Sequence, residues 1–234
     1  MHIPDLKGVR KASENLRDVS IVTPLNLNER LSEKLKCRIF FKREDLQKVR
    51  SFKIRGAFNK IKSLNLDNTQ DEKKIICASA GNHAQGVAYS CNKLKIFGTI
   101  YMPETTPKQK VERVKMFGGD FIEIILVGDT FDDAQAEAQK QLDNDTVFIH
   151  PFDDKEVIEG QGTVALEILD QIDKHFDYLV IPIGGGGLIA GIISVFKELS
   201  PKTKIIGVEA QGAPAMSDSL KQNKIIELKK IDNF

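Results

Sequence analysis

Residues 178–193 read Tyr178-Leu-Val-Ile-Pro-Ile183, then glycine at each of positions 184–187, then Leu188-Ile-Ala-Gly-Ile-Ile193. Four successive glycines add unfolded-state entropy and remove side chains from the core, so packing alone does not favour them. Backbone N–H groups that must approach an anion closely do favour them, and the helix that follows prefers negative charge at its start. The stretch therefore predicts a phosphate-binding loop, with a plain mobile turn as the alternative.

The glycine loop does not fit the two common nucleotide-binding motifs. A P-loop needs Gly-Lys-Ser/Thr at its end, whereas Gly191 is followed by Ile192. The dinucleotide fingerprint needs a third glycine where this sequence has Ile189, and an acidic residue about twenty positions later that is absent here. We therefore expect the phosphate to belong to another kind of ligand.

The composition is that of an ordinary soluble globular chain. Its 234 residues are 41% hydrophobic and 29% charged, and the net charge is +1. Such a balance gives no electrostatic reason to expect nucleic acid or an anionic membrane as a partner. The absence of Trp and an aromatic content of 7% also argue against a platform on which bases stack.

Three features predict a cytoplasmic location. The N-terminal segment is charged and lacks the apolar core of a signal peptide. The uncharged stretch from Tyr178 to Phe196 is interrupted by Pro182 and the glycines, so neither half is long enough to cross a bilayer. The cysteines, at positions 37, 77 and 91, are odd in number and form no C-x-x-C pair, which predicts buried, reduced thiols.

Strand-like and helix-like segments alternate along the chain. Helices are predicted at 108–117, with Pro107 at the first turn, and at 131–142, where acidic residues gather near the start. This alternation predicts an α/β fold with parallel sheets covered on both faces. The predicted strands are rich in β-branched and aromatic residues and cover 38–42, 74–77, 96–101, 121–126, 147–149, 178–183 and 204–208.

Three further motifs precede the glycine loop: Arg50-Ser-Phe-Lys-Ile-Arg-Gly-Ala-Phe58, Cys77-Ala-Ser-Ala-Gly-Asn-His-Ala-Gln-Gly86 and Val157-Ile-Glu-Gly-Gln-Gly-Thr163. With them the chain resembles, from about Val22 to Phe234, the fold-type II pyridoxal-phosphate enzymes of the tryptophan-synthase-β type. Within these it is most similar to threonine (serine) dehydratases, and Lys42-Arg-Glu-Asp45 is similar to the biosynthetic type. The resemblance implies two parallel-sheet α/β domains with the cofactor, pyridoxal 5′-phosphate, in the cleft between them. The large cofactor-binding domain would comprise 1–72 and 151–234, with a small α/β domain inserted at 73–150.

Lys53 is the residue that this resemblance makes catalytic. An amine that bonds to an aldehyde must be neutral part of the time, and burial or a neighbouring cation lowers its pKa. Lys53 lies between Phe52 and Ile54, with Arg50 and Arg55 nearby. Taken alone, such a lysine would be a surface residue with a snorkelling side chain. The resemblance implies that Lys53 forms the Schiff base with the cofactor and that Phe52 packs near the cofactor ring, or is simply a core residue.

The segment Ser79-Ala-Gly-Asn-His83 follows a predicted strand and begins a predicted helix that runs to about Lys93. Free N–H groups at such a helix start suit a carboxylate, although Ser79 and Asn82 fit equally well as helix caps. The resemblance implies that Asn82 bonds the cofactor's 3′ oxygen. It also implies that Ser79, Ala80, Gly81, Asn82 and His83 grip the substrate carboxylate, with the His83 backbone mattering more than its ring. The phosphate would rest on Gly184, Gly185, Gly186, Gly187 and Leu188.

The residue at position 80 bears on the type of reaction. Similar racemases carry a serine there that moves a proton on the face opposite the lysine, and Ala80 cannot do so. We therefore expect a lyase, a threonine ammonia-lyase that converts L-threonine, and L-serine as a second substrate, to the 2-oxoacid and ammonia, as in isoleucine biosynthesis. The resemblance also implies a homo-oligomer acting on a small amino acid.

Two alternatives remain open at this point. Cysteine synthases, which catalyse β-replacement, carry Ser-x-Lys-Asp-Arg where this chain reads Ser51-Phe-Lys-Ile-Arg55. The residue that partners the cofactor's ring nitrogen is expected beyond Phe234, so the chain looks C-terminally truncated and an inactive pyridoxal-phosphate-binding fragment is the second alternative. Some proteins of the similar family bind a cation where Glu209 lies, but the second acidic ligand that the resemblance implies falls at Ala215, so no metal is expected although Asp218 is near. His2, His150 and His175 share no spacing with acids or cysteines and are predicted to be structural or surface residues.

Overall fold

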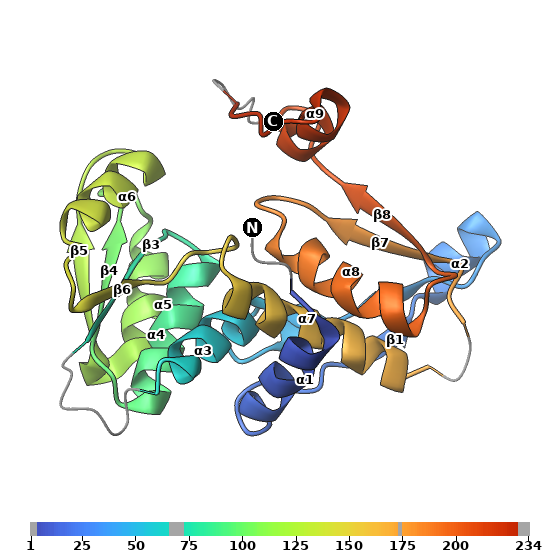
Figure 1. The fold of residues 1–234 in the computed structure, drawn as a ribbon, viewed down its shortest axis with the longest axis horizontal. Coiled ribbons are helices and arrows are strands. Elements are labelled where there is room, and N and C mark those ends of the chain that lie inside the picture. The colour runs from blue at the N-terminus through green and yellow to red at the C-terminus, as the bar shows by residue number, and fades with distance from the viewer. Residues whose placement is uncertain (1–3, 66–72, 173–174, 229–234) are drawn as a thin grey trace.

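The structure is a computed structural model that describes residues 4–65, 73–172 and 175–228 (Figure 1). Helices and strands alternate as the sequence predicted, and each predicted strand is present, with ends that differ by no more than two residues. The helices are α1 (Leu6–Asn15), α2 (Glu29–Leu35), α3 (Lys53–Ser63), α4 (Asn82–Leu94), α5 (Lys108–Gly118), α6 (Phe131–Lys140), α7 (Lys155–Asp170), α8 (Gly187–Leu199) and α9 (Ala215–Gln222). The strands are β1 (Leu25–Leu27), β2 (Phe40–Lys42), β3 (Lys74–Ala78), β4 (Gly98–Met102), β5 (Ile122–Leu126), β6 (Thr146–Phe148), β7 (Tyr178–Pro182) and β8 (Lys204–Val208).

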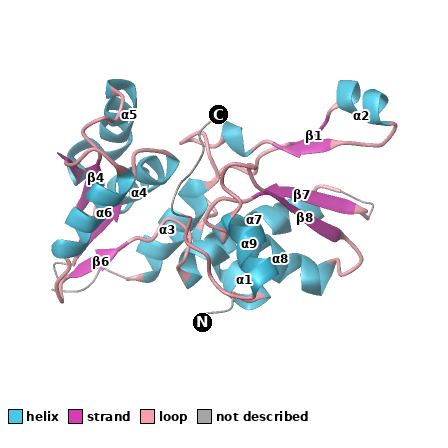
Figure 2. Ribbon diagram, turned by 90° about the horizontal axis from the view of Figure 1, so that it is seen from above, coloured by secondary structure: helices cyan, strands magenta, loops and turns pink. Residues whose placement is uncertain are grey.

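A parallel four-stranded sheet, in the order β5-β4-β3-β6, lies at one end of the molecule (Figures 1 and 2). Successive side chains of a strand point to opposite faces. Ile75 and Cys77 of β3 accordingly pack in one core cluster with residues of α4, whereas Ile76 and Ala78 pack in another with Ala134 of α6. The sheet is therefore covered on both faces, as predicted.

The second sheet departs from that prediction. It consists of β7 and β8, which pair in parallel, and Ile181 packs against α8 on its inner face. On the outer face Tyr178 is 56% exposed and Val180 is 61% exposed. The apolar run 178–183 would suit a strand buried on both faces, but within the described structure one face only is covered. The expectation of two covered faces is wrong for this sheet.

The strand predicted at 38–42 is also not part of a parallel sheet. It forms β2, which pairs antiparallel with β1, with Leu25 opposite Lys42. A parallel pair needs a crossover that packs across the sheet, and α2, which joins the two strands, has no buried residue. Cys37 follows α2 and is exposed, so the prediction of buried thiols holds for Cys77 and Cys91 only.

The helices α3 and α8 both pack closely against α7 (Figure 1). A Cβ added to Gly160 of α7 would lie 2.6 Å from the Arg55 carbonyl oxygen of α3. One added to Gly191 of α8 would lie 2.3 Å from the Ile158 carbonyl oxygen of α7. The glycines thus allow backbone-to-backbone approach on both sides of α7, which holds the starts of α3 and α8 in a fixed relation.

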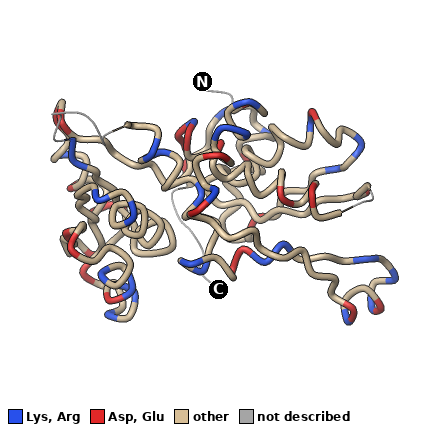
Figure 3. Tube along the Cα trace, turned by 90° about the horizontal axis from the view of Figure 1, so that it is seen from below, with Lys and Arg blue, Asp and Glu red and all other residues tan. Residues whose placement is uncertain are grey.

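Two further observations concern the molecule as a whole. Lys and Arg are interspersed with Asp and Glu along the described part of the trace (Figure 3). In the parts of the chain that are described, no helix is both long and apolar enough to cross a membrane. The division into an inserted domain at 73–150 and a surrounding domain stays a prediction.

Candidate active site

A pocket opens where α3 and α8 begin. It is lined by Phe52, Lys53, Pro151, Phe152, Gln161, Pro182, Gly184, Gly185, Gly186, Gly187 and Leu188. The fold thus brings the predicted lysine and its phenylalanine together with the predicted phosphate loop, which lies about 130 residues further along the chain. The residues of the 79–83 segment are not among those that line this pocket.

Lys53 is the first residue of α3, and its side chain is largely buried. Its Nζ donates a hydrogen bond of 2.6 Å to the Pro151 carbonyl oxygen and lies 5.5 Å from the centroid of the Phe52 ring. Burial lowers the pKa of Lys53 to about 8. At pH 7 about a tenth of the amine is therefore uncharged, and the uncharged form is the one that bonds to an aldehyde.

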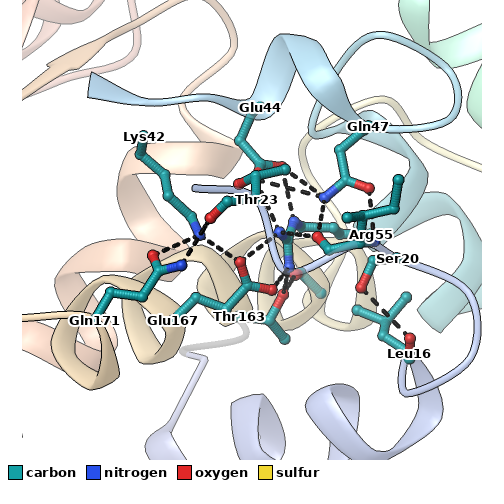
Figure 4. A network of polar contacts seen from close by, with 12 residues as sticks. Leu16, Ser20, Thr23, Lys42, Glu44, Gln47, Arg55, Thr163, Glu167 and Gln171 are labelled. Carbon is teal, nitrogen blue, oxygen red and sulfur yellow. Dashed lines mark hydrogen bonds and ion pairs between the residues drawn. The ribbon is translucent and has the colours of Figure 1, made fainter. Parts of the chain in front are cut away.

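The neighbouring arginines do not contribute to that shift. Arg55 is fully buried but points away into a network of its own (Figure 4). Its guanidinium donates two hydrogen bonds to Glu44, both of 2.8 Å, and two to Glu167, of 2.6 and 2.9 Å. Lys42 also contacts Glu167, at 2.5 Å. With its charge neutralised by two carboxylates, Arg55 holds the strand-and-turn segment 42–44 against α3 and α7 rather than acting on Lys53.

The reason why a side chain is absent differs between the glycines of the loop. A Cβ at Gly185 would lie 2.2 Å from the Phe152 ring, and one at Gly187 would lie 2.7 Å from the Phe152 carbonyl oxygen. Gly186 has a φ of 84°, in the region that favours glycine. Gly184 differs, because a Cβ there would meet no atom within 4 Å. Its missing side chain leaves open space at the pocket instead of relieving a contact within the protein.

The 79–83 segment leads from β3 into α4. The N-cap of α4 is Gly81, and no side chain caps the helix. The Ser79 hydroxyl instead accepts a hydrogen bond from the Gly81 N–H at 3.2 Å. Asn82 is exposed, and its side chain makes no hydrogen bond within the described ranges. The interpretation of Ser79 and Asn82 as helix caps is therefore wrong, while their roles toward a ligand stay predictions.

The helix that follows this segment, α4, nevertheless packs against the backbone of Lys53. A Cβ at Gly86, one turn into α4, would lie 3.1 Å from the Lys53 carbonyl carbon and oxygen, so α4 and α3 are in close contact there. The His83 ring is buried, and its Nε2 donates 2.8 Å to the Ile149 carbonyl oxygen. Burial lowers the pKa of His83 to about 3, with the nearby Lys53 charge adding to the effect. The ring is therefore neutral.

The segment 150–153 is a part of the site that the sequence did not single out. The Nδ1 atom of His150 accepts hydrogen bonds from the N–H groups of Phe152, at 3.3 Å, and Asp153, at 2.7 Å. This turn presents the Pro151 carbonyl to Lys53 and the Phe152 ring to the glycine loop. The only sequence signal was His-Pro after a predicted strand, which is too common to predict a site.

The Glu209 carboxylate lies at the start of α9. It accepts hydrogen bonds from the N–H groups of Met216, at 2.8 Å, and Ser217, at 2.7 Å, in the first turn of α9. A carboxylate in that position stabilises a helix N-terminus.

Comparison with known proteins places this geometry in a family. Residues 16–234 match the family described as pyridoxal-phosphate dependent enzyme. The chain is 54% identical over 224 residues to the biosynthetic L-threonine dehydratase IlvA of Halalkalibacterium halodurans, a match that covers 95% of this chain and 54% of that protein. It is 52% identical over 230 residues to the protein of the same name in Bacillus subtilis, with 98% and 54% covered. The chain thus spans about half the length of the curated relatives it matches.

Solved structures also resemble this chain closely. The processed form of threonine deaminase isoform 2 from Solanum lycopersicum superposes with a TM-score of 0.88 at 43% identity, covering 99% of this chain and 64% of that one. Maize serine racemase superposes with a TM-score of 0.91 at 33% identity, covering 99% and 69%. The fold is therefore shared between proteins named for different reactions.

Proposed function

Since the chain belongs to the family of pyridoxal-phosphate-dependent enzymes, we propose that it forms the cofactor-binding part of a threonine dehydratase. Its reaction would convert L-threonine to 2-oxobutanoate and ammonia, and L-serine to pyruvate and ammonia. The observation that carries this proposal is the Lys53 amine, with a pKa lowered to about 8, in one pocket with the glycine loop at the start of α8.

The residues of the pocket fit pyridoxal phosphate. Gly184 leaves space that no protein atom fills, next to the N-terminus of α8, where free N–H groups and the helix dipole favour a phosphate. Gly81, at the N-cap of α4, likewise has no atom within 4 Å of where its Cβ would be. These are the two loops that we assign to the cofactor phosphate and to the substrate carboxylate. Lys53 supplies the amine, and Phe52 an apolar wall.

When bound, pyridoxal phosphate supplies an electron sink that makes the α-proton of an amino acid acidic enough to be removed. The Lys53 amine, uncharged for part of the time, is the group that accepts this proton. The β-hydroxyl leaves as water and the amino group is released as ammonia after water is added back, so the atoms of threonine equal those of 2-oxobutanoate plus ammonia. Ala80 has no proton to exchange, which favours elimination over the racemisation named for the maize neighbour.

The remaining parts of the proposal follow from the relatives. The names of these relatives support a biosynthetic role, as in isoleucine biosynthesis, with a small amino acid as substrate. A cytoplasmic location and a homo-oligomeric assembly belong to the same proposal. The chain's near-neutral charge of +1 supports neither nucleic acid nor membrane as partner.

The test combines cofactor chemistry with turnover. The purified chain, mixed with pyridoxal phosphate, is expected to absorb visible light, and borohydride treatment is expected to leave a phosphopyridoxyl group on Lys53. Lys93 provides the control, because it is an exposed lysine on α4. Lys53→Ala should abolish the adduct and the threonine-dependent oxoacid, whereas Lys93→Ala should change neither.

Oxoacid formation that survives in the Lys53→Ala chain would overturn the proposal. An adduct without turnover would identify a binding fragment, and cysteine formation from O-acetylserine and sulfide would identify a β-replacement enzyme.

A further inference from the structure

The motif Gly160-Gln161-Gly162 lies at the centre of α7, and its glycines are explained by packing. Gly160 faces α3, as described above. A Cβ at Gly162 would lie 2.9 Å from the Gly191 carbonyl oxygen of α8. These close contacts account for the glycines on both sides of position 161 but not for the glutamine between them.

Gln161 is 1% exposed, and neither its Nε2 nor its Oε1 has a hydrogen-bond partner in the described parts of the chain. An unpaired buried amide is costly, and such groups are rare in folded proteins. Gln47 shows the usual situation at the same exposure of 1%. Its Oε1 accepts from the Ile21 N–H at 3.0 Å, and its Nε2 donates to the Ile21 carbonyl oxygen at 2.7 Å. A methionine at position 161 would fill the same volume without the cost.

The position of the Gln161 amide shows what it faces. The side chain lines the same pocket as Lys53 and the glycine loop. A Cβ added to Gly56 would lie 2.3 Å from Nε2, so the amide rests against α3 one turn beyond Lys53. Gly56 thus leaves room for the amide, which is held between the start of the lysine helix and the pocket.

We propose that Gln161 is a cofactor-contact residue whose amide makes its hydrogen bonds with pyridoxal phosphate. This inference rests on the proposed function and adds to it a residue on α7, a helix that supplies none of the predicted contacts. The amide nitrogen offers two N–H donors, and the ligand carries phosphate and ring oxygens that can accept them. The apo fold therefore leaves these N–H donors unpaired, and the ligand satisfies them.

The test compares Gln161→Met with Gln47→Met, measuring the thermal unfolding of the apo chain and the dissociation constant for pyridoxal phosphate. For Gln161→Met we expect an apo melting temperature equal to or above that of the wild type. We also expect a dissociation constant raised roughly tenfold to a hundredfold, the usual effect of losing a hydrogen bond to a charged group. Gln47→Met should show the opposite pattern in the apo chain, a lowered melting temperature, because both ends of that amide are paired.

A second variant, Gln161→Glu, keeps the shape of the side chain and replaces the N–H donors. Its affinity for pyridoxal phosphate should be weaker than that of the wild type and should fall further as the pH rises and the carboxyl ionises. The inference is overturned if both variants bind pyridoxal phosphate as the wild type does. It is equally overturned if apo Gln161→Met melts well below the wild type or fails to fold, because the amide then serves the fold. A wild-type chain that does not bind pyridoxal phosphate at all would contradict the proposed function instead.

Discussion

Replacing Arg55 by methionine should remove a large part of the stability of this chain. Methionine keeps an apolar stem in the buried site, so the change isolates the loss of the guanidinium. Glu44 and Glu167 then lose four charge-assisted hydrogen bonds of 2.6–2.9 Å. Glu167 keeps Lys42, at 2.5 Å, whereas Glu44 keeps no cationic hydrogen-bond partner (Figure 4). The penalty therefore falls mainly on the buried Glu44 carboxylate.

The size of that penalty can be bounded. The variant can avoid an unpaired buried charge by protonating Glu44, whose ordinary pKa is 4.5. Each unit of pH above that value costs about 1.4 kcal/mol, so protonation at pH 7 costs about 3.4 kcal/mol. This lies within the range of about 3–5 kcal/mol found when one partner of a buried ion pair is removed. For a chain of 234 residues it corresponds to a fall in melting temperature of roughly 7–14 °C.

The sign of the pH dependence follows from the same groups. In the wild type the Arg55 guanidinium holds the pKa of Glu44 below its ordinary value despite burial. Its contribution to stability is present above pH 4.5 and is lost as the pH falls through the lowered pKa. In the variant the cost of protonating Glu44 shrinks to about 0.7 kcal/mol at pH 5. The gap in stability between the two chains should therefore narrow from pH 7 to pH 5.

Thermal unfolding of the apo chains, followed by circular dichroism at pH 7 and pH 5, measures both effects. Arg43→Met is the control, because Arg43 pairs with Asp45 at the surface, with side chains 38% and 58% exposed. Such an exposed pair contributes little to stability because water screens it. The reasoning is refuted if Arg55→Met melts within the range of Arg43→Met, or if its deficit is the same at both pH values.

Three further predictions concern the pocket and the second sheet. Lys53→Met should raise the melting temperature of the apo chain at pH 7, because burial lowers the pKa of Lys53 to about 8 and the charged ammonium therefore opposes folding. This gain in melting temperature should vanish as the pH rises from 8 to 10.5. A gain that does not depend on pH would contradict this origin. Gly184→Ala should leave the stability of the apo chain within about 0.5 kcal/mol of the wild type but weaken the binding of pyridoxal phosphate. Gly191→Ala should lower the free energy of unfolding, measured in urea, by about 1–3 kcal/mol, because its Cβ would lie 2.3 Å from a backbone oxygen. Ile181→Ser should lower the free energy of unfolding by about 2–4 kcal/mol, whereas Val180→Ser, on the exposed face, should lower it by less than about 1 kcal/mol. Equal losses would show that the outer face of the sheet is covered in solution.

Local sequence patterns located most of the secondary structure but not the environment of each element. The β-branched runs at 74–78 and 204–208 both form parallel strands, because side-chain shape favours an extended backbone wherever the strand lies. The run at 178–183 was expected to be buried on both faces, yet burial depends on what packs above the sheet, and the residues of the strand do not determine that. The same limit applies to β2, whose antiparallel partner β1 was missed because three residues are too few for an alternating pattern to stand out.

The amino-acid sequence by itself determined the chemistry that this chain can offer: an amine between two apolar residues at 53, a glycine loop before a helix at 184–187, and no proton-carrying side chain at 80. Those features are local, so they could be read from neighbouring residues. Only the tertiary structure decided that α7 holds the two motifs at one pocket, that Arg55 is neutralised by Glu44 and Glu167, and that Gln161 stays unpaired. Desolvation and pairing depend on residues that are separated along the chain, by 112 positions for Arg55 and Glu167, and folding alone brings these into contact.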